Sequence, residues 1–231
     1  MNLEPFTHLT FDCYGTLIDW ETGILQSLMP HIGATGAAVT EEQVLRLYTR
    51  FEAEEEAGEY RPYRTILENV SARIASEIGV SLSPQGRLVL PNSVGRWPPF
   101  PDTIAALHRL KSRFKLVILS NIDDAFFTQT RDVLGIDFDE VITAEQLGSY
   151  KPRKAHFETA LARLGVPKEQ ILHVAQSLYH DHVPAKEMGF STVWINRPSR
   201  LPDTGLSLPV DTRPDLEFPD LRSLAEHEMT G

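Results

Sequence analysis

The stretch LTFDCYGTLIDW (residues 9–20) carries an apolar run into Asp12 and then breaks at a glycine. Such a run predicts a buried strand over residues 8–12, with the carboxylate of Asp12 at its carboxyl end. Taken alone, an aspartate before a Tyr-Gly-Thr turn is most simply an Asx turn or the N-cap of the next helix. Whether Asp12 has a chemical role depends on what the rest of the chain places beside it.

The second half of the chain alternates two kinds of segment. Short, β-branched apolar runs are found at 114–119, 140–143, 171–174 and 192–195. Helical patterns rich in Ala, Leu and charged residues accompany them at 102–112, 123–134, 154–164 and 183–188. This alternation predicts an α/β fold with a Rossmann-like, doubly wound parallel sheet. Ligands of such sheets bind at the carboxyl ends of the strands, which is where Asp12 is expected.

Residues 20–97 differ from the rest because they show helical patterns and no convincing strand. The expected helices cover 23–31, 41–57, 63–78 and 84–94. The stretch GRWPPFPD (95–102) disfavours regular structure and is the expected return into the sheet. We therefore expect a core domain of residues 1–19 and 98–231, interrupted by an inserted helical domain of residues 20–97. After Arg197, a proline-rich surface loop should precede a last helix at 221–228.

The composition limits the classes of partner. The chain carries a formal net charge of −10, and 42% of its 231 residues are hydrophobic, which is enough for a sizeable core. It has no Lys- or Arg-rich run, so neither nucleic acid nor an anionic membrane is expected as a partner. No apolar run approaches the ~18 residues of a membrane span, and no basic region with an apolar run is found at the N-terminus, so neither a membrane span nor export is expected. With Cys13 as its one cysteine, the protein is expected to be cytoplasmic.

Polar residues follow three other predicted strands, as Asp12 follows the first. They are Ser120 and Asn121, then Lys151, and then Gln176, Ser177 and Asp181. At one sheet edge these would bring together two carboxylates, a hydroxyl and an ammonium, and a carboxylate beside a cation can act as a nucleophile. Each also has an ordinary structural interpretation: a helix cap for Ser120 or Asp181, and a solvated side chain for Lys151.

Four motifs occur in the order that characterises a known family. They are Asp12-Cys-Tyr-Gly-Thr-Leu17, Ser120-Asn121, Lys151-Pro152 and the loop Ala175-Gln-Ser-Leu-Tyr-His-Asp181. With these motifs and WINR (194–197), the chain resembles the haloacid dehalogenase superfamily, and within it the L-2-haloacid dehalogenase branch. The inserted helices resemble the cap domain of that family.

Two positions separate the dehalogenase branch from the phosphatases of the superfamily. In the phosphatases, an acid two places after the nucleophile protonates the leaving group. Tyr14 stands at that place here, and a halide needs no proton. Gln176 replaces an acid of the final loop, so two of three carboxylates that would hold Mg²⁺ are missing. The resemblance therefore implies a metal-independent enzyme with no cofactor.

The resemblance implies a hydrolytic dehalogenase of small 2-haloalkanoic acids, with an aspartyl ester on Asp12 as its intermediate. Lys151 would hold Asp12 ionised. Asp181 would orient Lys151 or the hydrolytic water. Thr16 and Ser177 complete the catalytic set that the family motifs indicate.

The substrate of such an enzyme is a small organic anion. Ser120 and the amides near Asn121 would bind its carboxylate. Tyr14 would lie beside it, as would Phe157, which stands where the family has an active-site tyrosine.

The family receives the halide on an arginine of the cap. On a helical wheel, Arg50 lies nearer the edge of the apolar stripe than Arg46, so Arg50 is favoured as that residue. A surface position is the alternative for both arginines.

Two other functions are compatible with the family. One is a phosphatase acting on a small phosphate ester, which Tyr14 and Gln176 oppose. The other is a non-catalytic binding protein. The joint retention of five residues opposes it: Asp12, Thr16, Ser120, Lys151 and Asp181. A homodimer is one assembly that we consider.

Overall fold

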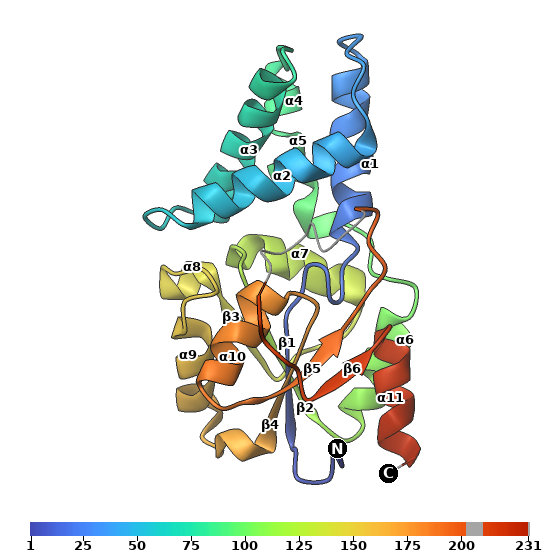
Figure 1. Cartoon of the computed structure of the whole chain (residues 1–231), viewed down its shortest axis with the longest axis vertical. Coiled ribbons are helices and arrows are strands. Elements are labelled where there is room, and N and C mark those ends of the chain that lie inside the picture. Colours follow the sequence, from blue (N-terminus) through green and yellow to red (C-terminus); the bar gives the residue numbers. More distant parts are fainter. Residues whose placement is uncertain (202–209, 231) are drawn as a thin grey trace.

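A parallel sheet lies at the centre of the lower part of the molecule in Figure 1, and the computed structural model describes residues 1–201 and 210–230 of the chain. Over this part of the chain the sheet has six strands in the order β3-β2-β1-β4-β5-β6, and every neighbouring pair is parallel. Their bounds are β1 (His8–Phe11), β2 (Lys115–Ser120), β3 (Glu140–Thr143), β4 (Ile171–Ala175), β5 (Ser191–Ile195) and β6 (Leu216–Phe218). The order reverses at β1, so the predicted doubly wound sheet is confirmed.

Helices cover both faces of the sheet because its strands are apolar on both sides. Along β2, Leu116 and Ile118 belong to one buried cluster, whereas Val117 and Leu119 belong to another. The helices of this layer are α6 (Thr103–Lys111), α7 (Asp124–Leu134), α8 (Ala144–Leu147), α9 (Ala155–Leu164), α10 (Val183–Glu187) and α11 (Leu221–Thr230), with the short turn η2 (Lys168–Gln170) before β4. Figure 1 shows α9 and α10 on one side of the sheet and α6 and α11 on the other.

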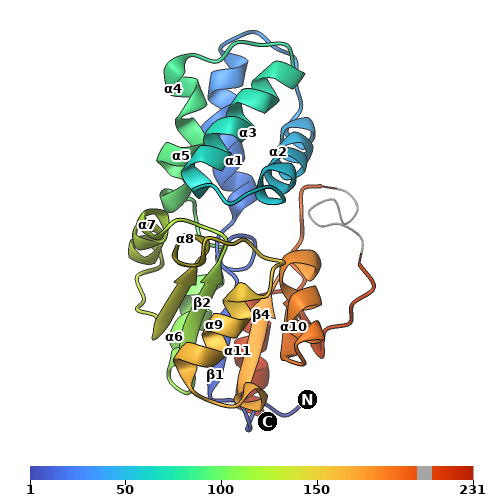
Figure 2. The ribbon, with the colours of Figure 1, turned by 90° about the vertical axis from the view of Figure 1, so that its left-hand side faces the viewer.

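A separate group of helices stands above the carboxyl edge of the sheet (Figure 1, Figure 2). We call these the cap helices: α1 (Trp20–Gly33), α2 (Glu41–Glu56), α3 (Tyr63–Glu77), α4 (Pro84–Arg87), α5 (Val89–Ser93) and η1 (Val94–Arg96). Helix α1 begins after Asp19, whose carboxylate accepts a hydrogen bond from the backbone N–H of Thr22 at 3.0 Å. Helix α2 begins with a capping box between Thr40 and Gln43.

The single helix predicted over 84–94 is wrong, because the chain forms α4, α5 and η1 there. Pro91 explains the first break. It has no N–H to donate to the carbonyl of Arg87, and its ring would crowd that carbonyl in a continuous helix.

Polar contacts tie the cap helices to the sheet layer. The carboxylate of Asp123 accepts hydrogen bonds from the backbone N–H groups of Tyr63 at 2.8 Å and Arg64 at 2.9 Å. It thereby caps α3, whose own preceding residue, Pro62, offers no side-chain cap. The hydroxyl of Tyr150 donates to the carbonyl of Arg61 at 2.7 Å. The division into domains of residues 1–19 with 98–231 and of residues 20–97 stays a prediction.

The proline-rich segment after Arg197 contains a strand that the sequence did not predict. Strand β6 pairs with β5, at the edge of the sheet. It is only three residues long and lies between Pro214 and Pro219, and edge strands tolerate nearby prolines better than central ones. The part of the predicted loop at 202–209 lies outside the described residues.

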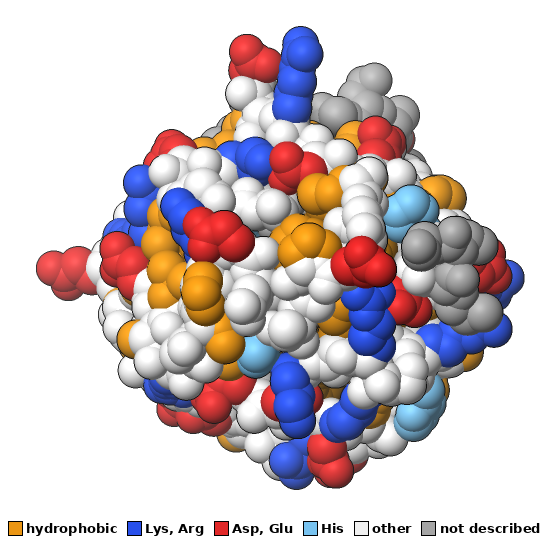
Figure 3. All heavy atoms as spheres, turned by 90° about the horizontal axis from the view of Figure 1, so that it is seen from below, with side chains coloured by type: hydrophobic (Ala, Val, Ile, Leu, Met, Phe, Trp, Pro, Cys, Tyr) orange, Lys and Arg blue, Asp and Glu red, His pale blue; other side chains and the backbone are white. Residues whose placement is uncertain are grey.

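The charged side chains are mixed over the end of the molecule that Figure 3 shows, which is the end away from the cap helices. Lysine and arginine lie there among aspartate and glutamate. Among the described residues, no helix combines the length and the apolar character that crossing a bilayer requires.

Candidate active site

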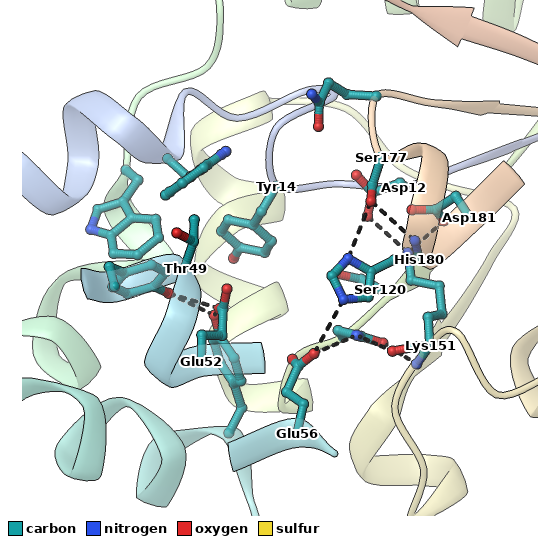
Figure 4. A pocket seen from close by; sticks show the side chains of 16 residues that line it. Asp12, Tyr14, Thr49, Glu52, Glu56, Ser120, Lys151, Ser177, His180 and Asp181 are labelled. Atoms are coloured by element: carbon teal, nitrogen blue, oxygen red, sulfur yellow. Dashed lines mark hydrogen bonds and ion pairs between the residues drawn. The ribbon is translucent and has the colours of Figure 1, made fainter. Parts of the chain in front are cut away.

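A cavity of about 100 Å³ lies between the carboxyl edge of the sheet and the cap helices (Figure 4). The sequence-predicted residues that line it are Asp12, Tyr14, Ser120, Asn121, Lys151, Ser177 and Asp181. The cap helices contribute residues that were not predicted, among them Trp20, Tyr48, Thr49, Glu52, Glu56 and Tyr63. The predicted polar groups thus lie together at the sheet edge, and aromatic and acidic side chains of the cap helices line the opposite side of the cavity.

Asp12 is fixed by two side chains at the end of β1. Its carboxylate accepts hydrogen bonds from the ammonium of Lys151 at 2.9 Å and from the hydroxyl of Thr16 at 2.7 Å. The turn that returns Thr16 to Asp12 passes through Gly15 at φ +95°, a backbone conformation that other residues rarely adopt. Thr16 also accepts from the backbone N–H of Gln176 at 2.9 Å, which joins the loops after β1 and β4.

Lys151 is buried with all three of its N–H donors in use. They reach Asp12 at 2.9 Å, Asp181 at 2.7 Å and the carbonyl of Leu119 at 2.9 Å. Asn121 holds the lysine backbone, because its side chain accepts from the N–H of Lys151 at 2.7 Å and donates to its carbonyl at 3.1 Å. Lys151 is therefore not a solvated side chain. Ser120 and Asp181 are not helix caps either, because the N-cap residues of α7 and α10 are Asp123 and His182.

Burial and mutual charge set the ionisation of this cluster. Burial lowers the pKa of Lys151, but the charges of Asp12 and Asp181 outweigh it and raise that pKa above its usual value. Burial also raises the pKa of Asp181, but Lys151, then His173, brings that pKa well below its usual range. Burial raises the pKa of Asp12, opposed by Lys151 and reinforced by Asp181. Two carboxylates share one ammonium, and Asp181 holds its charge the more firmly.

Two residues that line the cavity each have a buried polar atom with no hydrogen-bond partner among the described residues. These atoms are the hydroxyl oxygen of Ser120 and the Oδ2 atom of Asp181, both fully buried. The other oxygen of Asp181 accepts from Lys151 and lies 3.0 Å from Nε2 of His173. Buried polar atoms without partners are costly, so these two are atoms that a bound molecule would satisfy.

Asp181 lies in η3 (Leu178–His182), a single wide π-helical turn after β4 that the sequence did not predict. In the same turn, His180 was missed as a cavity residue. Its Nδ1 lies 3.1 Å from the hydroxyl of Ser177, and its Nε2 lies 3.8 Å from the carboxylate of Glu56 in the cap. Burial lowers the pKa of His180 to about 4, so the imidazole is neutral at pH 7.

Tyr14 lines the cavity with its ring, and its hydroxyl is engaged elsewhere. That hydroxyl shares a 2.6 Å hydrogen bond with Thr130 of α7, and its ring meets Trp97 edge-on with 6.0 Å between centroids. Burial raises the pKa of Tyr14 well above its usual value. Tyr14 is therefore placed to shape the wall, not to protonate a leaving group.

The side chains of the site differ from those that Mg²⁺ requires, the ion that phosphatases of this fold use. Asp12 and Asp181 already bind the ammonium of Lys151 between them, at 2.9 and 2.7 Å. The third position holds the neutral side chain of Gln176, and Mg²⁺ is held in proteins chiefly by carboxylates and phosphate. The residues present do not fit a magnesium ion.

The cap wall is acidic, which the sequence interpretation missed. Oε1 of Glu52 accepts hydrogen bonds from the hydroxyls of Tyr48, at 2.8 Å, and Tyr63. Oε2 of Glu56 accepts from the side chain of Asn121 at 3.2 Å. Tyr48, Glu52 and Glu56 are spaced by four residues along α2, so they share one face. That spacing was the signal available in the sequence.

The prediction that Arg50 reaches the site is wrong. Its side chain is 50% exposed, pairs with Glu54 and Glu77, and lies over the ring of Phe51 at 4.4 Å, away from the cavity. Arg46 pairs with Glu42 at 2.9 Å and does not line the cavity either. The apolar stripe of α2 packs against the other cap helices and not against the sheet. A position at the edge of this stripe therefore did not indicate that Arg50 faces the sheet.

The prediction for Phe157 is also wrong. Its ring is buried in the core between α9 and the sheet, 4.9 Å from the ring centroid of His173 and 5.5 Å from that of Phe190. Phe157 packs against the ring of His173 in the core and does not line the cavity. His173 itself is the satisfied core histidine that its strand position suggests, and its Nδ1 lies 2.9 Å from the hydroxyl of Thr10.

A doubly wound sheet that ends β1 in a lysine-bound aspartate, under a helical cap, defines a class of hydrolases. The family model of haloacid dehalogenase-like hydrolases matches residues 6–181, and the chain belongs to this family.

Individual relatives agree with this assignment. The chain is 28% identical over 197 residues to an (S)-2-haloacid dehalogenase of Pseudomonas putida, covering 82% of this chain and 84% of that one. It is 37% identical over 102 residues to a glyceraldehyde 3-phosphate phosphatase of Methanocaldococcus jannaschii, covering 42% and 44%. Its fold matches an L-2-haloacid dehalogenase of Xanthobacter autotrophicus with chloropropionic acid covalently bound, at a TM-score of 0.81 and 20% identity, covering 96% and 97%.

Proposed function

We propose that this protein is a metal-independent hydrolytic dehalogenase of small 2-haloacids that works through an ester on Asp12. The observation that carries this is the pairing of Asp12 with Lys151 and Thr16, beside a Tyr14 whose hydroxyl is bound to Thr130 and is not placed to protonate a leaving group. The relatives named (S)-2-haloacid dehalogenase support it over most of the chain. The covalently bound chloropropionic acid in a structure of the same fold supports the covalent step.

In the first step, a carboxylate oxygen of Asp12 attacks the carbon that bears the halogen. A carbon–oxygen bond forms, and the carbon–halogen bond breaks with its electron pair leaving on the halide. Attack from behind inverts the carbon. Lys151 and Thr16 orient the carboxylate and favour its charged form, although burial works against that form.

In the second step, water attacks the carbonyl carbon of the Asp12 ester. Asp181 is placed to position that water through Oδ2, the oxygen that has no partner among the described residues. One proton of the water passes by way of Asp181 to the oxygen of the hydroxy acid that leaves, and the other is released to solvent as Asp12 is restored as a carboxylate. Ser120, whose hydroxyl is also unpartnered there, is placed to bind the substrate carboxylate.

A single turnover in H₂¹⁸O tests the covalent step, with 2-chloropropionate as the probe. Attack by Asp12 puts an unlabelled oxygen into the lactate formed and leaves ¹⁸O on the Asp12 peptide, as mass spectrometry would show. Labelled lactate with an unlabelled Asp12 peptide would exclude the ester. Asp12→Asn should release no halide, apart from any slow deamidation back to aspartate.

A phosphatase is the second candidate, because the partial match to a phosphatase covers 42% of the chain. Parallel assays of chloride release and of phosphate release from generic esters separate the two functions, each with and without EDTA. We expect chloride release that EDTA leaves unchanged. Phosphate release that EDTA abolishes and Mg²⁺ restores would replace the dehalogenase by the phosphatase. No turnover of either kind would favour a binding protein.

A further inference from the structure

The charges around the cavity offer little attraction to a substrate whose one charge is a carboxylate. Among the described residues that line it, Lys151 is the one lysine or arginine, and its three donors are already taken by Asp12, Asp181 and a carbonyl. His180 is neutral at pH 7. A purely anionic substrate would therefore find no free cation in this part of the chain, on the sheet side or on the cap side.

Opposite the sheet edge, the acidic wall, which we define as Glu52 and Glu56 of α2, faces the same cavity (Figure 4). One oxygen of each carboxylate accepts from neutral groups: two tyrosine hydroxyls for Glu52 and an amide for Glu56. The structure gives the other oxygen of each no hydrogen-bond partner among the described residues. Burial raises the pKa of both groups, and for Glu56 the nearby charge of Glu52 adds to it.

A second observation marks the cavity as a place for a ligand with two polar ends. The hydroxyl of Ser120 and Oδ2 of Asp181 are buried, unpartnered in the described structure, and line the sheet side of the cavity. A molecule that satisfies Ser120 with its carboxylate therefore extends from the sheet edge into a space bounded by the acidic wall. The cavity, at about 100 Å³, admits only a small molecule.

We propose that the substrate is a small 2-haloacid that also carries a primary ammonium group, with its carboxylate at Ser120 and its ammonium at the acidic wall. This rests on the proposed dehalogenase function and names its substrate class. An ammonium offers three donors, which can reach the free oxygens of both Glu52 and Glu56. With an alkyl group at the same place, half-buried Glu52 and buried Glu56 would have no counter-charge, and their raised pKa values would favour the neutral acids. An ammonium would supply that counter-charge and favour the charged carboxylates.

Binding of the hydrolysis product tests this without requiring turnover. The two probes are 4-amino-2-hydroxybutanoate and 2-hydroxypentanoate, which differ in having an ammonium or a methyl group at the end of the chain. Isothermal titration gives the ratio of their dissociation constants in one protein preparation. We expect the amino acid to bind at least about tenfold more tightly, a preference equal to about 1.4 kcal/mol.

Variants then locate the preference. In Glu52→Gln and in Glu56→Gln, the ratio should fall toward one. Glu54→Gln is the matched control on the same helix, since Glu54 is 50% exposed and pairs with arginines outside the cavity, and it should keep the wild-type ratio. Because each ratio compares two ligands on the same protein, a modest loss of folded fraction does not change it.

Equal binding of the two probes, tighter binding of 2-hydroxypentanoate, or no binding of the amino acid overturns the assigned substrate class. A preference that survives in both glutamine variants overturns the role of the acidic wall. The dehalogenase function fails by a different observation, namely that no chloride is released from 2-chloropropionate or from freshly prepared 4-amino-2-chlorobutanoate while the binding preference remains.

Discussion

The sheet side and the cap side of the cavity balance their charges in different ways. On the sheet side, the ammonium of Lys151 binds two carboxylates within 2.9 Å, so opposite charges satisfy one another. On the cap side, Glu52 and Glu56 accept hydrogen bonds from neutral donors, and the neutral imidazole of His180 lies 3.8 Å from the carboxylate of Glu56. The carboxylates of the sheet side have a counter-charge before a ligand binds, and those of the cap side do not. Such a difference is expected if the sheet edge carries out the reaction and the cap selects the substrate.

Removing the one cation should have the largest effect on this comparison. Lys151→Met leaves Asp12 and Asp181 buried without their counter-charge, which should cost about 3–5 kcal/mol of unfolding free energy. It should also reduce halide release below detection, because Asp12 then loses its charge and its orientation. Urea denaturation and halide assays measure the two effects.

The matched control is Lys154→Met, since Lys154 is 43% exposed and pairs with Glu187 at the surface. It should change stability by less than about 1 kcal/mol. If Lys151→Met were as stable as Lys154→Met, the sheet side would not depend on its ion pairs, and the contrast between the two walls would fail.

Asp181→Asn should separate the two chemical steps. The amide can still hold Lys151 and position water, but it cannot accept a proton, so ester hydrolysis should slow by about 10²–10⁴-fold. Ester formation should persist, giving a burst of one halide per enzyme followed by a slow steady state. Rapid-quench measurement of halide and the mass of the Asp12 peptide would show this. A steady state as fast as that of the wild type would assign the water to another group.

The fall of kcat/KM at low pH should reflect protonation of Asp12. Burial raises the pKa of Asp12, and only its carboxylate attacks, so kcat/KM should fall as pH falls through a pKa above the ~3.9 of an ordinary aspartate. The buried histidines are not expected to set this limb, because burial lowers the pKa of His156 to about 3 and those of His180 and His182 to about 4.

Glu56→Gln is the control for the pH profile, since the pKa of Glu56 is also raised, by burial and then by Glu52. If Asp12 governs the limb, the variant should keep a limb above the ordinary aspartate range. If the fall of kcat/KM at low pH were absent from Glu56→Gln, the ionisation of Glu56 on the cap side would control the reaction instead.

The sheet side was predictable from sequence and the cap side was not, for a physical reason. Parallel strands end at one edge, so the residues after each apolar run, such as Asp12 and Lys151, had to meet there. The face of α2 that looks toward the sheet depends on how the cap helices pack on one another. Arg50 and Glu52 are only two residues apart, yet they lie on opposite faces. An apolar stripe identifies a buried face and not the polar residues beside it that reach a cavity.

Arg50→Ala should have the smallest effect, and it tests whether the cap selects its substrate by carboxylates or by a cation. The ion pairs of Arg50 with Glu54 and Glu77 are half exposed at 3.9 and 3.4 Å, and such pairs are worth at most about 1 kcal/mol. Neither Arg50 nor Arg46 lines the cavity. In Arg50→Ala and in Arg46→Ala, kcat/KM for 2-chloropropionate should therefore change by less than about twofold. Steady-state halide release from both variants measures this. A loss in Arg50→Ala greater than tenfold, absent from Arg46→Ala, would mean that the cap turns a different face of α2 to the substrate during turnover. The acidic wall would then no longer be the surface that the substrate meets.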